Sequence, residues 1–145
     1  MLDKTREIFD SKKRFLKRYS RIMKRIERLE DKLFELDSRL YKVTTGEMTD
    51  MPRGGGSLTM DDIIVLKEET TERIYALIKE SRDIRKEIVV ALDELEDFRH
   101  VEVLEHFFID GKSIEEIAEE SGYTVRHTIR FYTDAINLLD SRICQ

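Results

Sequence analysis

Apolar residues recur at alternating intervals of three and four along the first third of the chain, with charged residues between them. This spacing is typical of a long helix that buries one stripe against another helix. Only Lys12 interrupts the series, which contains Ile8, Phe15, Tyr19, Ile22, Ile26, Leu29, Leu33, Leu36, Leu40 and Val43. The pattern predicts a first helix that ends near residue 43.

A segment rich in helix-breaking residues follows at positions 44–58, with Gly46, Pro52 and the run 54–56 of three glycines. These residues predict a loop. Thr59 and Asp62 then resemble the start of a helix. A second heptad series predicts another long helix, and it contains Thr70, Ile74, Leu77, Ser81, Ile84, Ile88, Ala91, Leu95 and Phe98.

Each long helix would span roughly 55 Å, and neither can bury its apolar stripe without a partner. Folding back at the loop would place residue i near residue 102 minus i, so that Leu33 and Leu36 approach Ile74 and Leu66. Basic residues of the first helix would then face acidic residues of the second, which favours an antiparallel hairpin. A parallel dimer along the first series is the alternative, because heptads alone do not fix the partner.

The C-terminal segment predicts three short helices. The first covers about 98–109 and ends before Gly111, and the second begins at Ser113, which forms a capping box with Glu116. Gly122 ends the second helix, and Thr124 is expected to cap a third that runs to about residue 142. The side chains expected to point inward are Val101, Leu104, Phe108, Ile114, Ile117, Ala118, Phe131, Ala135, Leu138 and Leu139.

The spacing of Ala118, Gly122 and Phe131 is typical of a helix-turn-helix, which needs a small residue at the helix crossing, a glycine in the turn and an apolar anchor afterwards. The third helix would then enter the major groove of duplex DNA. Arginine can pair with guanine, valine can touch thymine methyl groups, and the helix N-terminus can hold a phosphate. The candidate DNA-binding residues are Thr124, Val125, Arg126, His127, Arg130 and Thr133.

The segment VEVLEHFFIDGKSIEEIAEESGYTVRHTIRFYTDAINLL resembles region four of bacterial sigma factors, which reads promoters. Joined to a helical hairpin containing MPRGGGS at 51–57, it is similar to phage transcriptional regulators of the ArpU and RinA type. This resemblance covers nearly the whole chain. It implies a phage or prophage regulator that controls late, packaging or lysis genes, with DNA reading carried by Val125, Arg126, His127 and Arg130.

These patterns together predict an all-α protein. Residues 1–97 would form a coiled-coil hairpin, and residues 98–145 would form a domain similar to sigma region four with a helix-turn-helix.

Charge is distributed unevenly along the 145 residues, whose net charge is −5. Residues 1–42 hold 14 Lys and Arg against 8 Asp and Glu, whereas residues 43–145 hold 12 against 23. Any DNA contact must therefore be local. Four bases of the first helix, Lys13, Lys17, Arg18 and Arg21, are candidates for secondary phosphate contacts. Pairing of this basic stripe with the acidic second helix is the favoured alternative.

Several functions lack support in the sequence. Cys144 is the only cysteine, and the three histidines have no metal-binding spacing, so no metal or other cofactor is expected. No grouping suggests catalysis, and we expect the protein not to be an enzyme. No apolar run approaches the roughly 20 residues of a membrane span, and the N-terminus does not resemble a signal peptide. A cytoplasmic location without membrane contact is therefore expected.

The resulting hypothesis is a transcriptional regulator that binds double-stranded DNA through its C-terminal helix-turn-helix. RNA polymerase and a second copy of the chain, joined through the coiled coil, are further expected partners. The alternative hypothesis is an interaction protein whose hairpin binds or inhibits a host or phage protein, with a vestigial helix-turn-helix.

Overall fold

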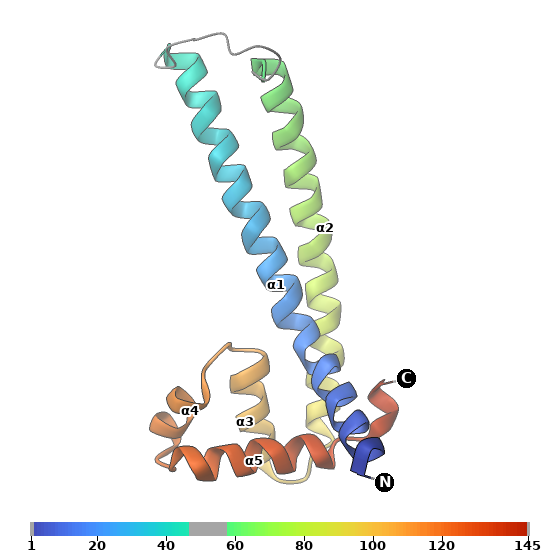
Figure 1. Ribbon diagram of the computed structural model, residues 1–145. Helices are drawn as coiled ribbons and strands as arrows, with labels where there is room; N and C mark the ends of the chain where they lie inside the picture. The colour runs from blue at the N-terminus through green and yellow to red at the C-terminus, as the bar shows by residue number, and fades with distance from the viewer. Residues whose placement is uncertain (1, 47–57, 145) are drawn as a thin grey trace. The chain divides into compact units, whose positions relative to one another are not determined.

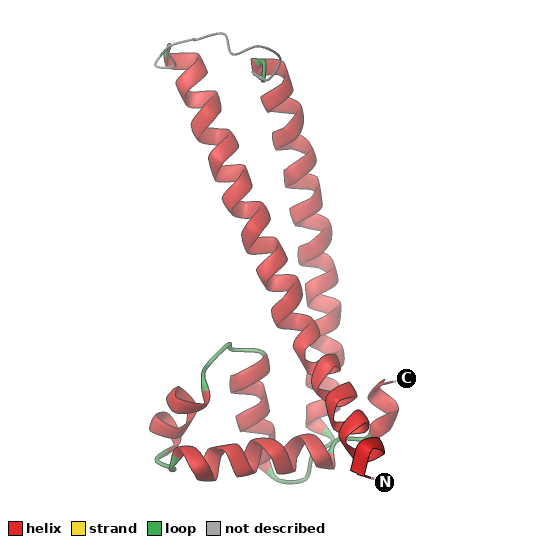
Figure 2. Ribbon diagram, in the orientation of Figure 1, coloured by secondary structure: helices red, strands yellow, loops and turns green. Residues whose placement is uncertain are grey.

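The computed structural model describes residues 2–46 and 58–144, which form helices and connecting turns without a β-strand (Figures 1 and 2). The all-α prediction is confirmed. The elements are α1 (Leu2–Thr45), α2 (Met60–Asp93), α3 (Phe98–Phe108), α4 (Ile114–Ser121), α5 (Val125–Leu138) and the 3-10 helix η1 (Ser141–Cys144). Thr44 and Thr45, which were predicted to belong to the loop at 44–58, form the end of α1. Residues 47–57 of that loop lie outside the described residues.

Contacts divide the chain into two compact units. The first unit contains Met1–Ile22 and Ser81–Gln145, and the second contains Met23–Glu80. Helices α1 and α2 therefore each contribute one segment to both units, and the boundary expected between residues 97 and 98 falls inside the first unit.

The second unit is a pair of helical segments that lie side by side and run in opposite directions (Figure 1). Its buried apolar side chains are Ile26, Leu36, Ile63 and Ile74. An ion pair of 2.5 Å between Lys67 Nζ and Asp37 Oδ1 joins the two segments. At the start of α2, the Asp62 amide donates to Thr59 Oγ1 and the Thr59 amide donates to Asp62 Oδ2, as the sequence predicted for this helix start.

In the first unit, the segments of α1 and α2 bury Leu16, Ile88 and Leu92 almost completely. Arg18 Nη1 lies 2.8 Å from Glu87 Oε2, so the helices pair within one chain. Glu87 is three positions beyond residue 84, which the expected register places opposite Arg18. Long side chains reach diagonally across a helix pair, so this ion pair fits an antiparallel arrangement.

Helices α3, α4 and α5 pack against one another and form what we call the three-helix group. Its core contains Val103, Leu104, Phe108, Ile117, Ala118, Ala135, Ile136 and Leu139. The capping box predicted for Ser113 and Glu116 is present, and Gly111 and Gly122 adopt left-handed conformations with φ of 71° and 74°. Glycine has no Cβ, so it adopts this conformation at little cost and lets each helix end sharply.

Lys12, which interrupts the first heptad series, is buried within the first unit. Its side chain is only 6% exposed, and Nζ donates a 3.1 Å hydrogen bond to the backbone carbonyl of Asn137. That carbonyl lies in the last turn of α5, where the helix dipole attracts a positive charge. The lysine that breaks the heptad pattern therefore makes a polar contact between α1 and α5.

The predicted ends of α2 and α5 are wrong, and so is the predicted burial of Leu138. Helix α2 ends at Asp93, so Leu95 and Phe98 do not continue its stripe, and Phe98 is 72% exposed. The chain leaves the helix in a turn in which the Leu95 amide donates to the Leu92 carbonyl, and Asp97 then caps α3. Helix α5 ends at Leu138 because Leu139 is extended, and Leu138 is 62% exposed while Ile136 fills the core.

Replacing a buried leucine of α1 tests the packing of the second unit. Leu36 is 4% exposed, so Leu36→Asp should lower the free energy of unfolding by several kcal/mol because it buries a carboxylate without a partner. Leu2, which is 88% exposed, provides the matched control, and Leu2→Asp should change stability by less than about 0.5 kcal/mol. Urea unfolding followed by circular dichroism measures both, and equal midpoints would contradict the packing.

Removing the Lys12 side chain tests the contact between α1 and α5. Lys12→Ala should cost about 1–3 kcal/mol because the Asn137 carbonyl loses its charged donor and the buried methylene groups leave a gap. Lys4→Ala, at an exposed site of the same helix, should leave stability unchanged. If the two variants unfold at the same denaturant concentration, the buried hydrogen bond does not stabilise the fold.

Candidate nucleic-acid interface

A tight turn of three residues, 122–124, joins α4 to α5. Gly122 ends α4 in the left-handed conformation, and the Tyr123 amide donates a 3.1 Å hydrogen bond to the Ala118 carbonyl. Ala118 itself is buried, and α4 packs on both α3 and α5. The three residues that the sequence singled out for this turn have the expected character. Ala118 is small and buried, Gly122 is left-handed, and Phe131 provides a half-buried ring on α5.

Thr124 caps the N-terminus of α5, as the sequence predicted. Its hydroxyl accepts the His127 amide at 3.1 Å, and its carbonyl accepts the Thr128 hydroxyl at 3.0 Å. The amides of Val125 and Arg126 have no acceptor among the described residues. Unpaired amides at a helix N-terminus point outward and favour an anion such as a phosphate.

The first two turns of α5 present a mixed apolar and basic surface. Val125 is 41% exposed, Ile129 is 47% exposed, and Arg126 and Arg130 are also exposed. The two arginines lie four residues apart and share one side of the helix, whereas the candidate Thr133 is half-buried. The candidate side chains therefore lie on one short helix, with its first turns open to solvent.

Arg126 and Arg130 differ from the other lysines and arginines of residues 98–144 because they make no ion pair or hydrogen bond among the described residues. Arg99 pairs with Asp97, Lys112 with Glu120, and Arg142 with Asp140. The hydrogen bond that Arg99 donates to Asp97 raises the pKa of Arg99, and the one that Lys112 donates to Glu120 raises the pKa of Lys112. Arg126 and Arg130 are therefore the bases of this region that remain available to an external anion.

His127 lies in a cluster of rings and does not simply point away from the protein. Its ring centroid is 4.9 Å from that of Tyr123 and 4.6 Å from that of Phe131. The guanidinium carbon of Arg99 lies 5.1 Å from the centre of the Phe131 ring. Sequence reasoning placed His127 at the surface, where it is, but missed Tyr123 and Arg99, because no pattern in the sequence indicates that α3 brings Arg99 to this cluster.

Tyr132, on the side of α5 that faces α3, has a structural role. Its ring stacks on Phe108 at 5.8 Å and meets the Phe107 ring edge-on at 5.0 Å. Partial burial raises the pKa of Tyr132 to about 12, so the phenol stays neutral at physiological pH.

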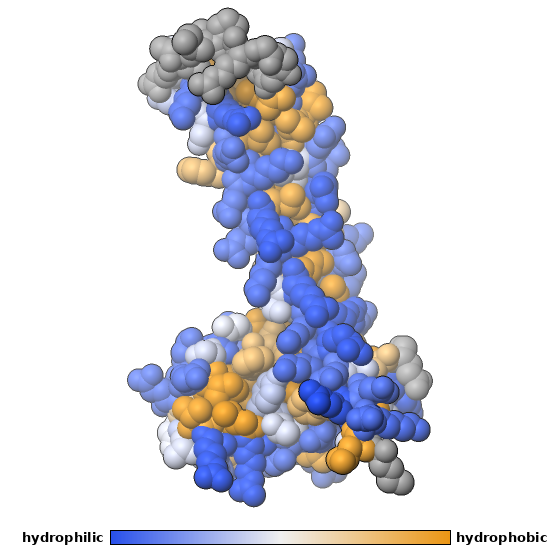
Figure 3. Space-filling model, in the orientation of Figure 1, coloured by the Kyte–Doolittle hydropathy of each residue, from blue (hydrophilic) through white to orange (hydrophobic). Residues whose placement is uncertain are grey.

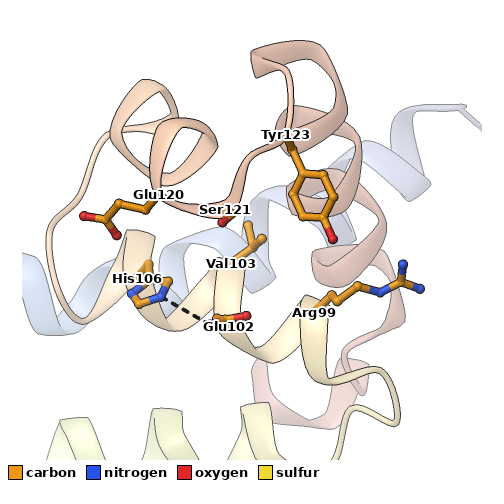
Figure 4. Close-up of a pocket in the computed structure, with 7 residues that line it drawn as sticks. All are labelled: Arg99, Glu102, Val103, His106, Glu120, Ser121 and Tyr123. Carbon is orange, nitrogen blue, oxygen red and sulfur yellow. Dashed lines mark ion pairs between the residues drawn. The ribbon is translucent and has the colours of Figure 1, made fainter.

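A pocket of about 280 Å³ lies between α3 and the end of α4, close to the turn that precedes α5 (Figure 4). His106 forms part of its wall, with Nδ1 at 2.9 Å from Asp110 Oδ2 and Nε2 at 3.8 Å from Glu102 Oε1. Glu120 also lines the pocket. These carboxylates oppose the binding of a phosphate here, so we place no nucleic-acid contact in the pocket.

The basic stripe of α1 is divided between structural and free side chains. Arg18 pairs with Glu87 and lies 5.2 Å from the centre of the Phe15 ring. Lys13 and Lys17 are half-buried and Arg21 is exposed, and none of the three has an ion-pair partner among the described residues. The predicted pairing with α2 is therefore found at Arg18, while the other three bases remain candidates for phosphate contacts.

The described part of the chain contains no group of three His, Cys, Asp or Glu residues that could hold a metal ion. None of its helices combines the length and the apolar character needed to cross a membrane.

Comparisons with known proteins found no match among family models, curated proteins or solved structures. The resemblance to phage regulators therefore stays a prediction that depends on the residues quoted above.

Proposed function

We propose that this protein is a sequence-specific DNA-binding regulator whose helix α5 enters the major groove of duplex DNA. The resemblance of the sequence to phage regulators extends this proposal to control of late, packaging or lysis genes and to a role for RNA polymerase as partner. The protein would act in the cytoplasm by binding, without a catalytic step.

The observation that carries the proposal is the pair of unpaired arginines on the first turns of α5. Within residues 98–144, the three other lysines and arginines are neutralised by carboxylates of their own chain. A guanidinium group binds a guanine edge or a phosphate through two parallel hydrogen bonds, which requires that it be free of such a carboxylate. Exposed Val125 and Ile129 beside the arginines suit contact with thymine methyl groups.

The charge of the surroundings determines what kind of binding to expect. Residues 101–145 hold 4 bases against 9 acids, including the two acidic pairs of α4 at 115–116 and 119–120. Such a surface repels the phosphate backbone except where α5 approaches it, so non-specific affinity should be weak. Discrimination between sequences would therefore depend largely on base contacts.

The alternative hypothesis of an interaction protein receives support from a different part of the molecule. Several large apolar side chains of the second unit are exposed, among them Phe34 at 73% and Tyr75 at 68%. A surface of this kind favours contact with a protein, although it does not conflict with DNA binding by α5.

Substituting both arginines tests the proposal directly. Duplexes that bind the pure protein are first selected from a randomised pool. On the selected duplex, Arg126→Ala with Arg130→Ala should weaken binding by about 30-fold or more, because each of the two base contacts contributes about 1–3 kcal/mol of discrimination. Binding to random DNA should change much less, as measured by fluorescence anisotropy at fixed salt.

Arg142→Ala is the matched control, because Arg142 belongs to the same region but pairs with Asp140. This variant should bind the selected duplex as the wild type does. A folded double variant that retains full discrimination would remove Arg126 and Arg130 from recognition, and failure of the pool to yield any preferred duplex would overturn the proposed function.

The free bases of α1 lead to a separate prediction about salt dependence. If Lys13, Lys17 and Arg21 only solubilise the helix, replacing all three by alanine should leave the slope of log affinity against log salt unchanged. Each lost phosphate contact would instead reduce the magnitude of that slope by roughly one. Because Arg18 pairs with Glu87, Arg18 is left in place to preserve the fold. We expect an unchanged slope, and a reduction of two or more would place α1 on the DNA.

A further inference from the structure

The second unit carries apolar side chains that its own core does not use. Phe34 and Tyr41 on α1 are 73% and 62% exposed, and Met60, Ile64 and Tyr75 on α2 are 44%, 37% and 68% exposed. Figure 3 shows hydrophobic side chains gathered on the visible face of the second unit. We call these five residues the outer face. Their exposure sets them apart from Leu36, Ile63 and Ile74, which are buried between the two helices.

The spacing of these residues places each helix's members in one stripe. Phe34 and Tyr41 are seven residues apart, which is two helical turns. Met60 and Ile64 are four residues apart, and Tyr75 follows Ile64 by eleven, which is close to three turns. Each helix therefore has a second apolar stripe beside the one that forms the core.

An ion pair shows that the two stripes lie on the same side of the helix pair. Asp37 follows Phe34 by three residues and precedes Tyr41 by four, so it belongs to the α1 stripe. Lys67 follows Ile64 by three and belongs to the α2 stripe. Because Lys67 Nζ contacts Asp37 Oδ1 at 2.5 Å, the stripes are adjacent across the groove between the helices.

We propose that the outer face binds the outer face of a second copy of this chain, so that two hairpins form a four-helix bundle about a two-fold axis parallel to the helices. In this arrangement, α1 of one copy lies next to α2 of the other. The proposal concerns residues of the second unit alone and does not depend on DNA binding.

Charge complementarity favours the second copy as the occupant. With the axis parallel to the helices, equivalent residues of both copies lie at one level along the bundle, so Asp37 of each copy approaches Lys67 of the other. Acid and base then alternate around the bundle. Each Asp37 lies between Lys67 of its own copy and Lys67 of the other copy, and each Lys67 lies between two Asp37 side chains. An axis perpendicular to the helices would pack α1 against α1 and bring like charges together at this level.

Side-chain sizes and polar groups also match across this arrangement. Since Asp37 and Lys67 share a level, Tyr41 lies level with Ile64 of the second copy, and Tyr75 lies level with Glu30. A large ring would therefore pack against a smaller aliphatic side chain, and the Tyr75 hydroxyl would have a carboxylate acceptor. Glu30 is exposed and occupies the same stripe as Phe34, four residues before it.

The size of the outer face is sufficient for an interface. Two helices of about 20 residues side by side present a surface of roughly 30 Å by 20 Å, or about 600 Å² per copy. The two copies together would bury about 1,200 Å², which is the lower end of the range for specific protein complexes. Affinities for such areas start in the micromolar range, so the dimer should be detectable at ordinary protein concentrations.

The first experiment measures the mass of the full chain by analytical ultracentrifugation. The wild type should sediment at twice the monomer mass of 17.3 kDa. Phe34→Glu with Tyr75→Glu should weaken the association at least tenfold and give the monomer, with unchanged helix content. Val65→Glu is the matched control, because Val65 is 51% exposed on α2 but lies outside the stripe, and it should remain dimeric.

The second experiment tests the charge arrangement. Asp37→Lys alone and Lys67→Asp alone should each be monomeric, because four like charges would meet in the bundle. An equimolar mixture of the two variants should recover the dimer, since bases of one copy then face acids of the other. A monomeric wild type at about 100 µM, or a dimeric Phe34/Tyr75 variant, would overturn the proposal. If the mixed charge variants stay monomeric while each remains helical, positions 37 and 67 do not face each other across an interface, and the proposal is wrong.

Discussion

The buried ammonium group of Lys12 connects the long helices to the three-helix group. A lysine in a heptad position normally weakens a helix pair, because the charge must be taken out of water. Here Nζ donates to the Asn137 carbonyl at the end of α5, where the backbone of the helix carries partial negative charge. The contact therefore fixes the C-terminal end of α5 against α1 and leaves the other end of that helix to be positioned by α3 and α4.

The N-terminal end of α5 depends on local structure of a different kind. Gly122 fixes the turn and Thr124 caps α5 by accepting the His127 amide, and the Phe131 ring packs among His100, His127 and Arg99. Arg99 is not free to bind an external anion, because its guanidinium group contacts the Phe131 ring and is paired with Asp97. The free positive charge of the region is therefore restricted to one side of α5, and this restriction supports base recognition better than general attraction to DNA.

Sequence patterns predicted the elements better than their ends. The heptad series and the capping residues Ser113 and Thr124 gave the helices, since periodicity and caps are local properties of the chain. The ends of α2 and α5 were misplaced, because local periodicity does not signal the turn at residues 92–95 or the extended backbone of Leu139.

The site could be predicted only in part for the same reason. The exposed positions of α5 followed from the turn and the helix period. The internal pairing of Arg99, the ring cluster around His127 and the burial of Lys12 depend on residues distant in sequence. The second apolar stripe of α2 was also not recognised, because its members lie beside the core stripe and differ from it only in exposure.

The most direct test of the central claim is to map the DNA contact on the intact chain by NMR. A selected duplex is added to isotopically labelled protein, and the shift of each assigned backbone amide is followed. The account predicts the largest changes at the start of α5, at Val125, Arg126 and Arg130, with small changes in the second unit. Changes concentrated on α1 or on the outer face, with α5 unaffected, would contradict DNA recognition by α5.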